Sequence, residues 1–140
     1  MVVKTKYIDV NVFVYWLGKH PVFGEKAHRW IKDIESATQG EYVTSSLTIY
    51  EVLVIVAGLS GRGLDDIEFV SGILEAFTGL RGLIIEKFDI GDFDMALSLM
   101  KRYELDLEDA IHAAISLRLG VKEFVSNDED FDKTPLKRVF

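Results

Sequence analysis

Tyr7-Ile8-Asp9-Val10-Asn11-Val12-Phe13 decides the fold, because an acidic residue closes an apolar run at this point. Residues 6–10 are expected to form a buried strand, followed at once by a short helix that ends near Leu17. In an open parallel α/β sheet, the carboxyl ends of the strands and the adjacent helix starts share one edge, where ligands bind. Asp9 therefore predicts a functional site at that edge.

Three further acidic residues occupy similar junctions. Glu51 and Asp109 open two strongly apolar helices, and Asp128 follows the short apolar run Glu123-Phe124-Val125-Ser126-Asn127. If these carboxylates and Asp9 converge, each pair about 5 Å apart repels by roughly 3 kcal/mol at an effective dielectric constant near 20. Clusters of acidic oxygen ligands are the preferred setting for Mg²⁺ or Mn²⁺. The pattern predicts a metal-dependent reaction on a phosphate.

Strands and helices are expected to alternate along the chain. This order predicts an α/β fold with a mostly parallel central sheet of about four or five strands and helices on both faces. Pro21 suits the first turn of a helix. The expected strands cover residues 6–10, 42–44, 83–86, 124–125 and 138–139. After the short helix that ends at 17, the expected helices cover residues 21–38, 48–59, 64–77, 92–103 and 107–119.

The composition indicates one domain over residues 1–140. Of the 140 residues, 49% are hydrophobic, which readily supplies one core. The absence of cysteine excludes a thiolate zinc site and a Cys nucleophile, and it agrees with a reducing compartment. No apolar run approaches the roughly 20 residues that span a bilayer, and the N-terminus does not resemble a signal peptide. We therefore expect a cytoplasmic protein with no membrane partner.

The net charge of −7 argues against a protein that coats nucleic acid, because such binding needs a basic surface. It does not exclude an enzyme that meets nucleic acid locally through a bound metal. His20, His28 and His112 are too few and too far apart for a typical zinc set, and His112 is expected to be a packed side chain. A Gly-rich phosphate loop and a nucleophile elbow are both missing.

Each acidic position also has an ordinary structural explanation. Asp9 or Asn11 can cap the following helix, since both residue types are favoured at an N-cap. Thr48-Ile49-Tyr50-Glu51 matches a capping box, in which Glu51 would bond the backbone of the cap residue. Asp106 is the better cap candidate for the helix that contains Asp109. In the acidic loop that follows Asp128, a solvated turn explains Glu129 and Asp132.

The order and surroundings of these acids resemble the PIN domain family, and within it the small toxins of VapBC toxin–antitoxin pairs. The matching segments span almost the whole chain and cover residues 7–15, 44–52, 107–114 and 126–131. The resemblance implies a single PIN-like domain that cleaves single-stranded RNA with Mg²⁺ or Mn²⁺. It also implies a homodimer or higher homo-oligomer, and an antitoxin protein as partner.

Carried over by position, the resemblance assigns the catalytic and metal-binding roles to Asp9, Glu51, Asp109 and Asp128. It implies supporting roles for four more residues. Asn11 would order the first acid, Ser126 stands where the family often has Thr, and the auxiliary acids would be Asp106 and Asp130.

Two alternatives come from other functional classes. A phospho-accepting receiver domain has this size and binds Mg²⁺, and Asp89 follows the third expected strand. Such a domain also needs a Lys after its last strand, where none is clearly placed, and it has no role for Glu51. A catalytically silent PIN module is the second alternative, but a scaffold has no need for four mutually repelling carboxylates.

Overall fold

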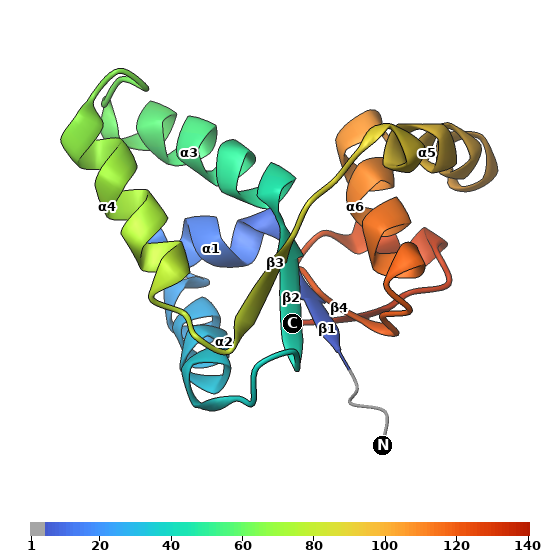
Figure 1. Ribbon diagram of the computed structural model, residues 1–140, viewed down its shortest axis with the longest axis horizontal. Coiled ribbons are helices and arrows are strands. Elements are labelled where there is room, and N and C mark those ends of the chain that lie inside the picture. Colours follow the sequence, from blue (N-terminus) through green and yellow to red (C-terminus); the bar gives the residue numbers. More distant parts are fainter. Residues whose placement is uncertain (1–4) are drawn as a thin grey trace.

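Within residues 5–140, which the computed structural model describes, five parallel strands form one sheet in the order β3-β2-β1-β4-β5 (Figure 1). The strands are β1 (Lys6–Ile8), β2 (Tyr42–Ser45), β3 (Leu83–Glu86), β4 (Glu123–Val125) and β5 (Lys137–Val139). The predicted parallel sheet is confirmed.

The chain changes direction across the sheet at β1. From β1 it passes to β2 and β3 on one side, and it then returns to β4 and β5 on the other side. Strand order therefore reverses beside β1, and ligands bind in the crevice at the carboxyl ends of strands at such a point. Asp9 follows β1 and Ser126 follows β4, so both residues lie at this crevice.

Helices cover both faces of the sheet, as predicted. Helices α1 to α4 lie on one side, and α5 and α6 lie on the other (Figure 1). None of the helices formed by residues 5–140 is long and apolar enough to cross a membrane. The helices are α1 (Val10–Leu17), α2 (Gly24–Ser36), α3 (Ser46–Ser60), α4 (Ile67–Thr78), α5 (Ile90–Tyr103) and α6 (Leu107–Arg118), with the short 3₁₀ helix η1 (Glu129–Lys133).

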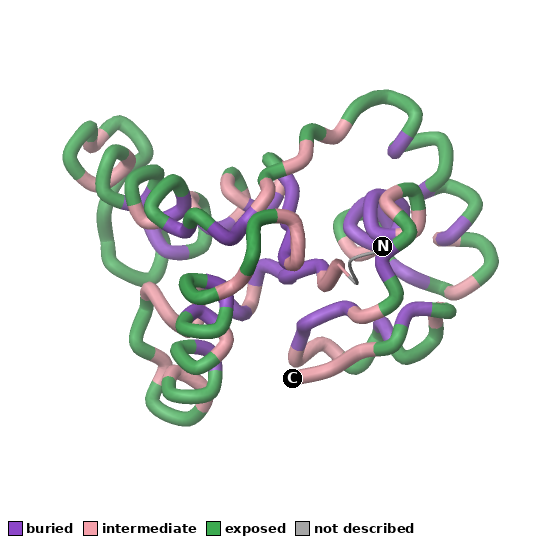
Figure 2. Tube along the Cα trace, turned by 60° about the horizontal axis from the view of Figure 1, so that its bottom comes forward, coloured by how far each residue is buried: buried purple, intermediate pink, exposed green. Residues whose placement is uncertain are grey.

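Side-chain alternation along the strands builds two cores, one on each face. Tyr7 packs with Phe124 and Phe131 beneath α5 and α6, whereas its neighbour Ile8 packs with Phe13 beneath α1 to α4. All five side chains are fully buried, and each of the Phe and Ile side chains contributes about 1.5–3 kcal/mol by leaving water. Figure 2 shows the buried residues concentrated on the strands and on the inner sides of the helices. Both cores hold the carboxyl ends of the strands in place.

Several predicted element boundaries were wrong by a few residues. The first strand stops at Ile8, since α1 already begins at Val10. Pro21 lies in a turn instead of a first helical turn, because His20 Nδ1 accepts hydrogen bonds from Val22 N and Phe23 N, both 3.1 Å away, and α2 starts only at Gly24.

Candidate metal centre

The four acids singled out in the sequence line one pocket of about 210 Å³. This volume holds several waters, each of which occupies about 30 Å³ in the liquid. The acids come from the end of β1, from α3, from the start of α6 and from the loop after β4. The pocket is lined by Asp9, Glu51, Asp109 and Asp128 together with Val10, Asn11, Val14, Ile55, Glu108 and His112. The fold thus gathers carboxylates that are far apart in the chain.

Asp9 is buried at the N-cap position of α1, yet its side chain makes no capping bond to the helix. Ser126 Oγ instead donates to Asp9 Oδ2 at 2.7 Å. The capping explanation was therefore wrong for Asp9, and also for Asn11, which lies inside α1. Burial raises the pKa of Asp9, while the charge of His112 and the Ser126 hydrogen bond oppose this rise.

Ser126 joins the ends of β1 and β4. Its hydroxyl donates to Asp9 and accepts hydrogen bonds from Asn11 Nδ2 and Asp128 N, both at 3.0 Å. Asn11 Oδ1 also accepts from Asn127 N at 3.3 Å. These bonds fix the loop that carries Asp128 against the end of β1, so Asn11 and Ser126 lie where they can orient the acids.

Glu51 lies beyond the first turn of α3. Ser45 caps this helix, because Thr48 N donates to Ser45 Oγ at 3.4 Å, and the capping box expected from Thr48 was wrong. Glu51 Oε1 lies 2.5 Å from His112 Nε2. Burial raises the pKa of Glu51, but the hydrogen bond and charge of His112 outweigh burial and lower that pKa overall. The lowered pKa favours the ionised form of Glu51, which lines the pocket.

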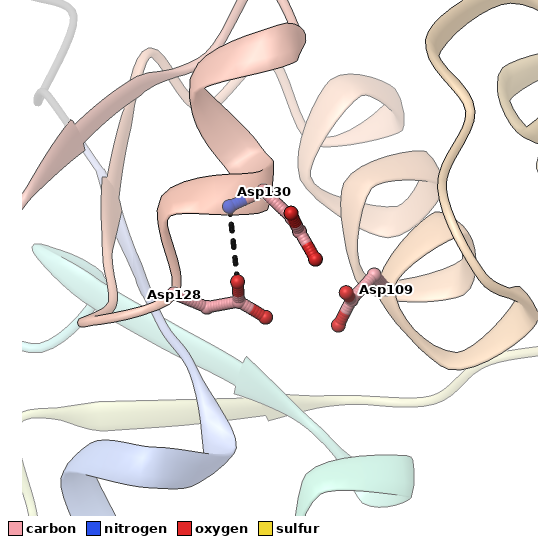
Figure 3. Close-up of side chains that lie close together, drawn as sticks. All are labelled: Asp109, Asp128 and Asp130. Atoms are coloured by element: carbon pink, nitrogen blue, oxygen red, sulfur yellow. Dashed lines mark hydrogen bonds between the residues drawn. The ribbon is translucent and has the colours of Figure 1, made fainter.

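Asp109, Asp128 and Asp130 turn their carboxylates toward one another (Figure 3). Each offers an oxygen, and these atoms all lie within 4.8 Å of one another. Asp106 caps α6 by accepting from Asp109 N at 2.9 Å, as the sequence predicted, and it does not line the pocket. Burial, together with the charges of Asp128, Asp106 and Asp9, raises the pKa of Asp109 to about 8.

The donor set fits a hard divalent cation. Two ionised carboxylates 4.8 Å apart repel by about 3.5 kcal/mol at an effective dielectric constant near 20, and by less where water screens an exposed side chain such as Asp130. A cation removes this repulsion, and carboxylate oxygens are the ligands preferred by Mg²⁺ and Mn²⁺. The pocket residues are therefore suited to Mg²⁺ or Mn²⁺.

Sequence reasoning missed two titratable residues of this pocket, Glu108 and His112. The hydrogen bond to Glu51 and the charge of Glu51 raise the pKa of Glu108. Burial lowers the pKa of His112, but Tyr7, the bond to Glu51 and the charge of Asp9 outweigh burial and raise that pKa well above its usual range. Spacing was the available signal, because His112 follows Asp109 by three residues and residues so spaced share a helix face.

The profile of the PIN domain matches residues 6–137. The chain belongs to the PIN domain family. No curated protein sequence matches it. Solved structures nevertheless share the fold of this PIN domain. Mycobacterium tuberculosis VapC20, a sarcin-ricin loop cleaving toxin, is 12% identical with a TM-score of 0.73, over 94% of this chain and 98% of that chain.

Two further structures similar to this PIN domain come from toxin–antitoxin systems. The toxin-antitoxin complex from Klebsiella pneumoniae contains a chain 18% identical with a TM-score of 0.71, over 96% of both chains. VapBC2 from Rickettsia felis, solved with a DNA fragment from its promoter, gives 18% identity and a TM-score of 0.68, over 96% of this chain and 97% of that chain. At these identities the likeness shows a shared fold.

Proposed function

We propose that residues 1–140 act as one PIN domain that hydrolyses RNA phosphodiester bonds with Mg²⁺ or Mn²⁺, as the toxin of a toxin–antitoxin pair. One observation carries this proposal. Asp9, Glu51, Asp109 and Asp128 line a single pocket at the point where strand order reverses. The family match and the VapC20 fold support a nuclease over an unrelated metal protein.

Each acid has a distinct part in this proposal. Asp9 and Asp128 would hold the ion most directly, while Glu51 and Asp109 would complete its shell or hold water in it. Asn11 and Ser126 keep Asp9 and the Asp128 loop in register through their hydrogen bonds. Asp130 is an auxiliary acid beside Asp128. Mg²⁺ or Mn²⁺ in this pocket supplies water activation and neutralises charge at the phosphate.

The proposed partners are an antitoxin and a second copy of the chain, in the cytoplasm. Toxin–antitoxin assemblies from Klebsiella pneumoniae and Rickettsia felis share this fold, which supports the antitoxin. A basic side chain of the antitoxin, most effectively Arg with its bidentate fork, suits a pocket lined by carboxylates. Such a side chain would occupy the place of the cation and inhibit the enzyme.

The receiver-domain alternative fails, because the chain is a PIN domain. The silent-module alternative predicts that the acids could be lost without consequence, and this can be measured. We expect the purified protein to cut single-stranded RNA with Mg²⁺ or Mn²⁺, to stop in EDTA, and to resume when Mn²⁺ is added in excess. Cleavage that is undiminished by EDTA would overturn the proposed function.

A further inference from the structure

His112 lies buried beside the acidic pocket, and both of its ring nitrogens are engaged. Nε2 lies 2.5 Å from Glu51 Oε1, and Nδ1 lies 2.7 Å from the Tyr7 hydroxyl. The side chain of His112 is only 2% exposed, whereas that of Glu51 is 13% exposed at the pocket. With both nitrogens held by protein atoms, His112 offers neither nitrogen to a cation, and its direct hydrogen bond to an acid of the pocket is the one to Glu51.

Tyr7 is itself firmly placed. Its ring stacks on Phe124 at a centroid distance of 5.3 Å and an interplanar angle of 6°. Its hydroxyl donates to Ser45 Oγ at 2.8 Å, and Ser45 is the cap of the helix that carries Glu51. The bonds therefore run from the cap of α3 through Tyr7 on β1 and His112 on α6 back to Glu51 on α3.

We propose that His112 is a positioning residue that fixes the Glu51 carboxylate for the cation, and that Tyr7 fixes the His112 ring. The inference rests on the proposed function because it takes Glu51 as a ligand. Glu51 has a long, rotatable side chain, and the bond from His112 holds its Oε1 in one place. Loss of a partner behind a metal ligand lowers metal affinity or activity roughly 10–100-fold.

Mn²⁺ affinity, measured by calorimetry on the metal-free protein, tests the inference without any RNA substrate. We expect His112→Leu to weaken Mn²⁺ binding roughly 10–100-fold, and Tyr7→Phe to weaken it several-fold because the ring loses its anchor. His112→Gln keeps an N–H donor near the position of Nε2 and should recover most of the affinity. Tyr42→Phe is the matched control, since Tyr42 is buried at the opposite end of the neighbouring strand.

A double-mutant cycle separates positioning from a general packing role. If His112 acts through Glu51, adding His112→Leu to Glu51→Gln should cause no further loss of Mn²⁺ affinity, because the two effects share one pathway. Equal losses in both backgrounds would overturn the inference. If His112→Leu fails to fold, the Mn²⁺ affinities of Tyr7→Phe and His112→Gln test the inference. Wild-type affinity in Tyr7→Phe together with weak binding in His112→Gln would overturn the inference.

The two proposals fail in different ways. Wild-type Mn²⁺ affinity in Glu51→Gln would remove Glu51 from the ligand set and would overturn both the proposed site and the positioning role. Weak binding in Glu51→Gln with wild-type affinity in His112→Leu and Tyr7→Phe would leave the proposed function standing and overturn only the inference about His112.

Discussion

Asp109 shows how the metal-free pocket limits the repulsion between its carboxylates. Asp109 lies at the start of α6, and its half-buried carboxyl faces Asp128 (Figure 3). Burial and the charges of Asp128, Asp106 and Asp9 raise its pKa to about 8. At neutral pH the metal-free pocket therefore keeps a proton on Asp109. Binding of a divalent cation should release that proton, since ligands must be deprotonated.

The raised pKa of Asp109 predicts a pH-dependent stability of the metal-free protein. The folded state binds this proton more tightly than the unfolded state. The contribution of Asp109 to the free energy of unfolding is therefore fully present below about pH 4, and it is lost as pH rises through about 8. Asp109→Asn should become more stable than wild type with rising pH, by on the order of 2 kcal/mol after screening of this half-exposed group.

Urea unfolding of wild type and Asp109→Asn across this pH range in EDTA measures the effect. The exposed Asp94→Asn on α5 is the matched control and should follow wild type. A constant difference between Asp109→Asn and wild type from pH 4 to pH 8 would contradict the assigned electrostatics of the pocket.

Substitution of a single ligand should separate activity from stability. Asp9→Asn and Asp128→Asn keep side-chain size but remove the charge of a proposed metal ligand. RNA cleavage should fall more than about 100-fold, which exceeds the loss expected when only a residue that hydrogen-bonds a metal ligand is removed. Thermal stability without metal should hold or rise, because charge repulsion is relieved. Cleavage rates and melting curves provide the measurement, and cleavage by Asp9→Asn equal to that by Asp94→Asn would contradict the site.

At the scale of the elements, α5 and α6 are held together by an ion pair outside the pocket. Arg118 Nε donates to Asp92 Oδ1 at 2.9 Å, and Arg118 Nη2 donates to Lys87 O at 3.1 Å. Asp92 is buried and also accepts from Asp89 N at 3.0 Å, which closes the capping box of α5. The pair therefore fixes the start of α5 to the end of α6.

Arg118→Ala should destabilise the protein by about 2 kcal/mol, since the buried Asp92 carboxylate loses charge-assisted hydrogen bonds. Lys101→Ala, at an exposed position on α5, is the control and should change stability little. Chemical denaturation measures both variants. A change in Arg118→Ala no larger than that in Lys101→Ala would show that the ion pair does not stabilise the α5–α6 contact.

The order of elements could be predicted from apolar runs, because each strand and helix of this fold buries a recognisable apolar segment. Helix starts were harder to predict, since several side chains compete to cap them. Ser45 caps α3 in preference to Thr48, whose own side chain bonds Thr44 Oγ1 at 2.9 Å. The convergence of the acids followed from their places at strand ends and near helix starts. The His112–Glu51 contact could not be predicted, because it depends on how α6 packs across from α3.

At the scale of the whole molecule, exposed apolar side chains favour self-association. Among the large apolar side chains, Phe77 and Leu80 are buried in the core. Other side chains remain exposed, among them Tyr50 and Leu59 on α3 and Ile90 on α5. Larger exposed apolar patches usually mark interfaces.

We predict that the purified chain is a dimer or larger assembly, and that it arrests growth unless an antitoxin is co-expressed. Sedimentation analysis measures the size of the assembly. Growth curves with and without co-expression of a candidate antitoxin measure the growth arrest. A strictly monomeric protein that is harmless when expressed alone would favour a housekeeping RNA-processing nuclease instead.

The most direct test of the metal-centred mechanism is to measure Mn²⁺ occupancy and RNA cleavage rate on the same samples during one Mn²⁺ titration. If the acidic pocket activates hydrolysis, both quantities should rise together, and Asp128→Asn should shift both to higher Mn²⁺ concentration. Cleavage at full rate while the pocket is empty, or full occupancy without cleavage of any RNA, would contradict the account.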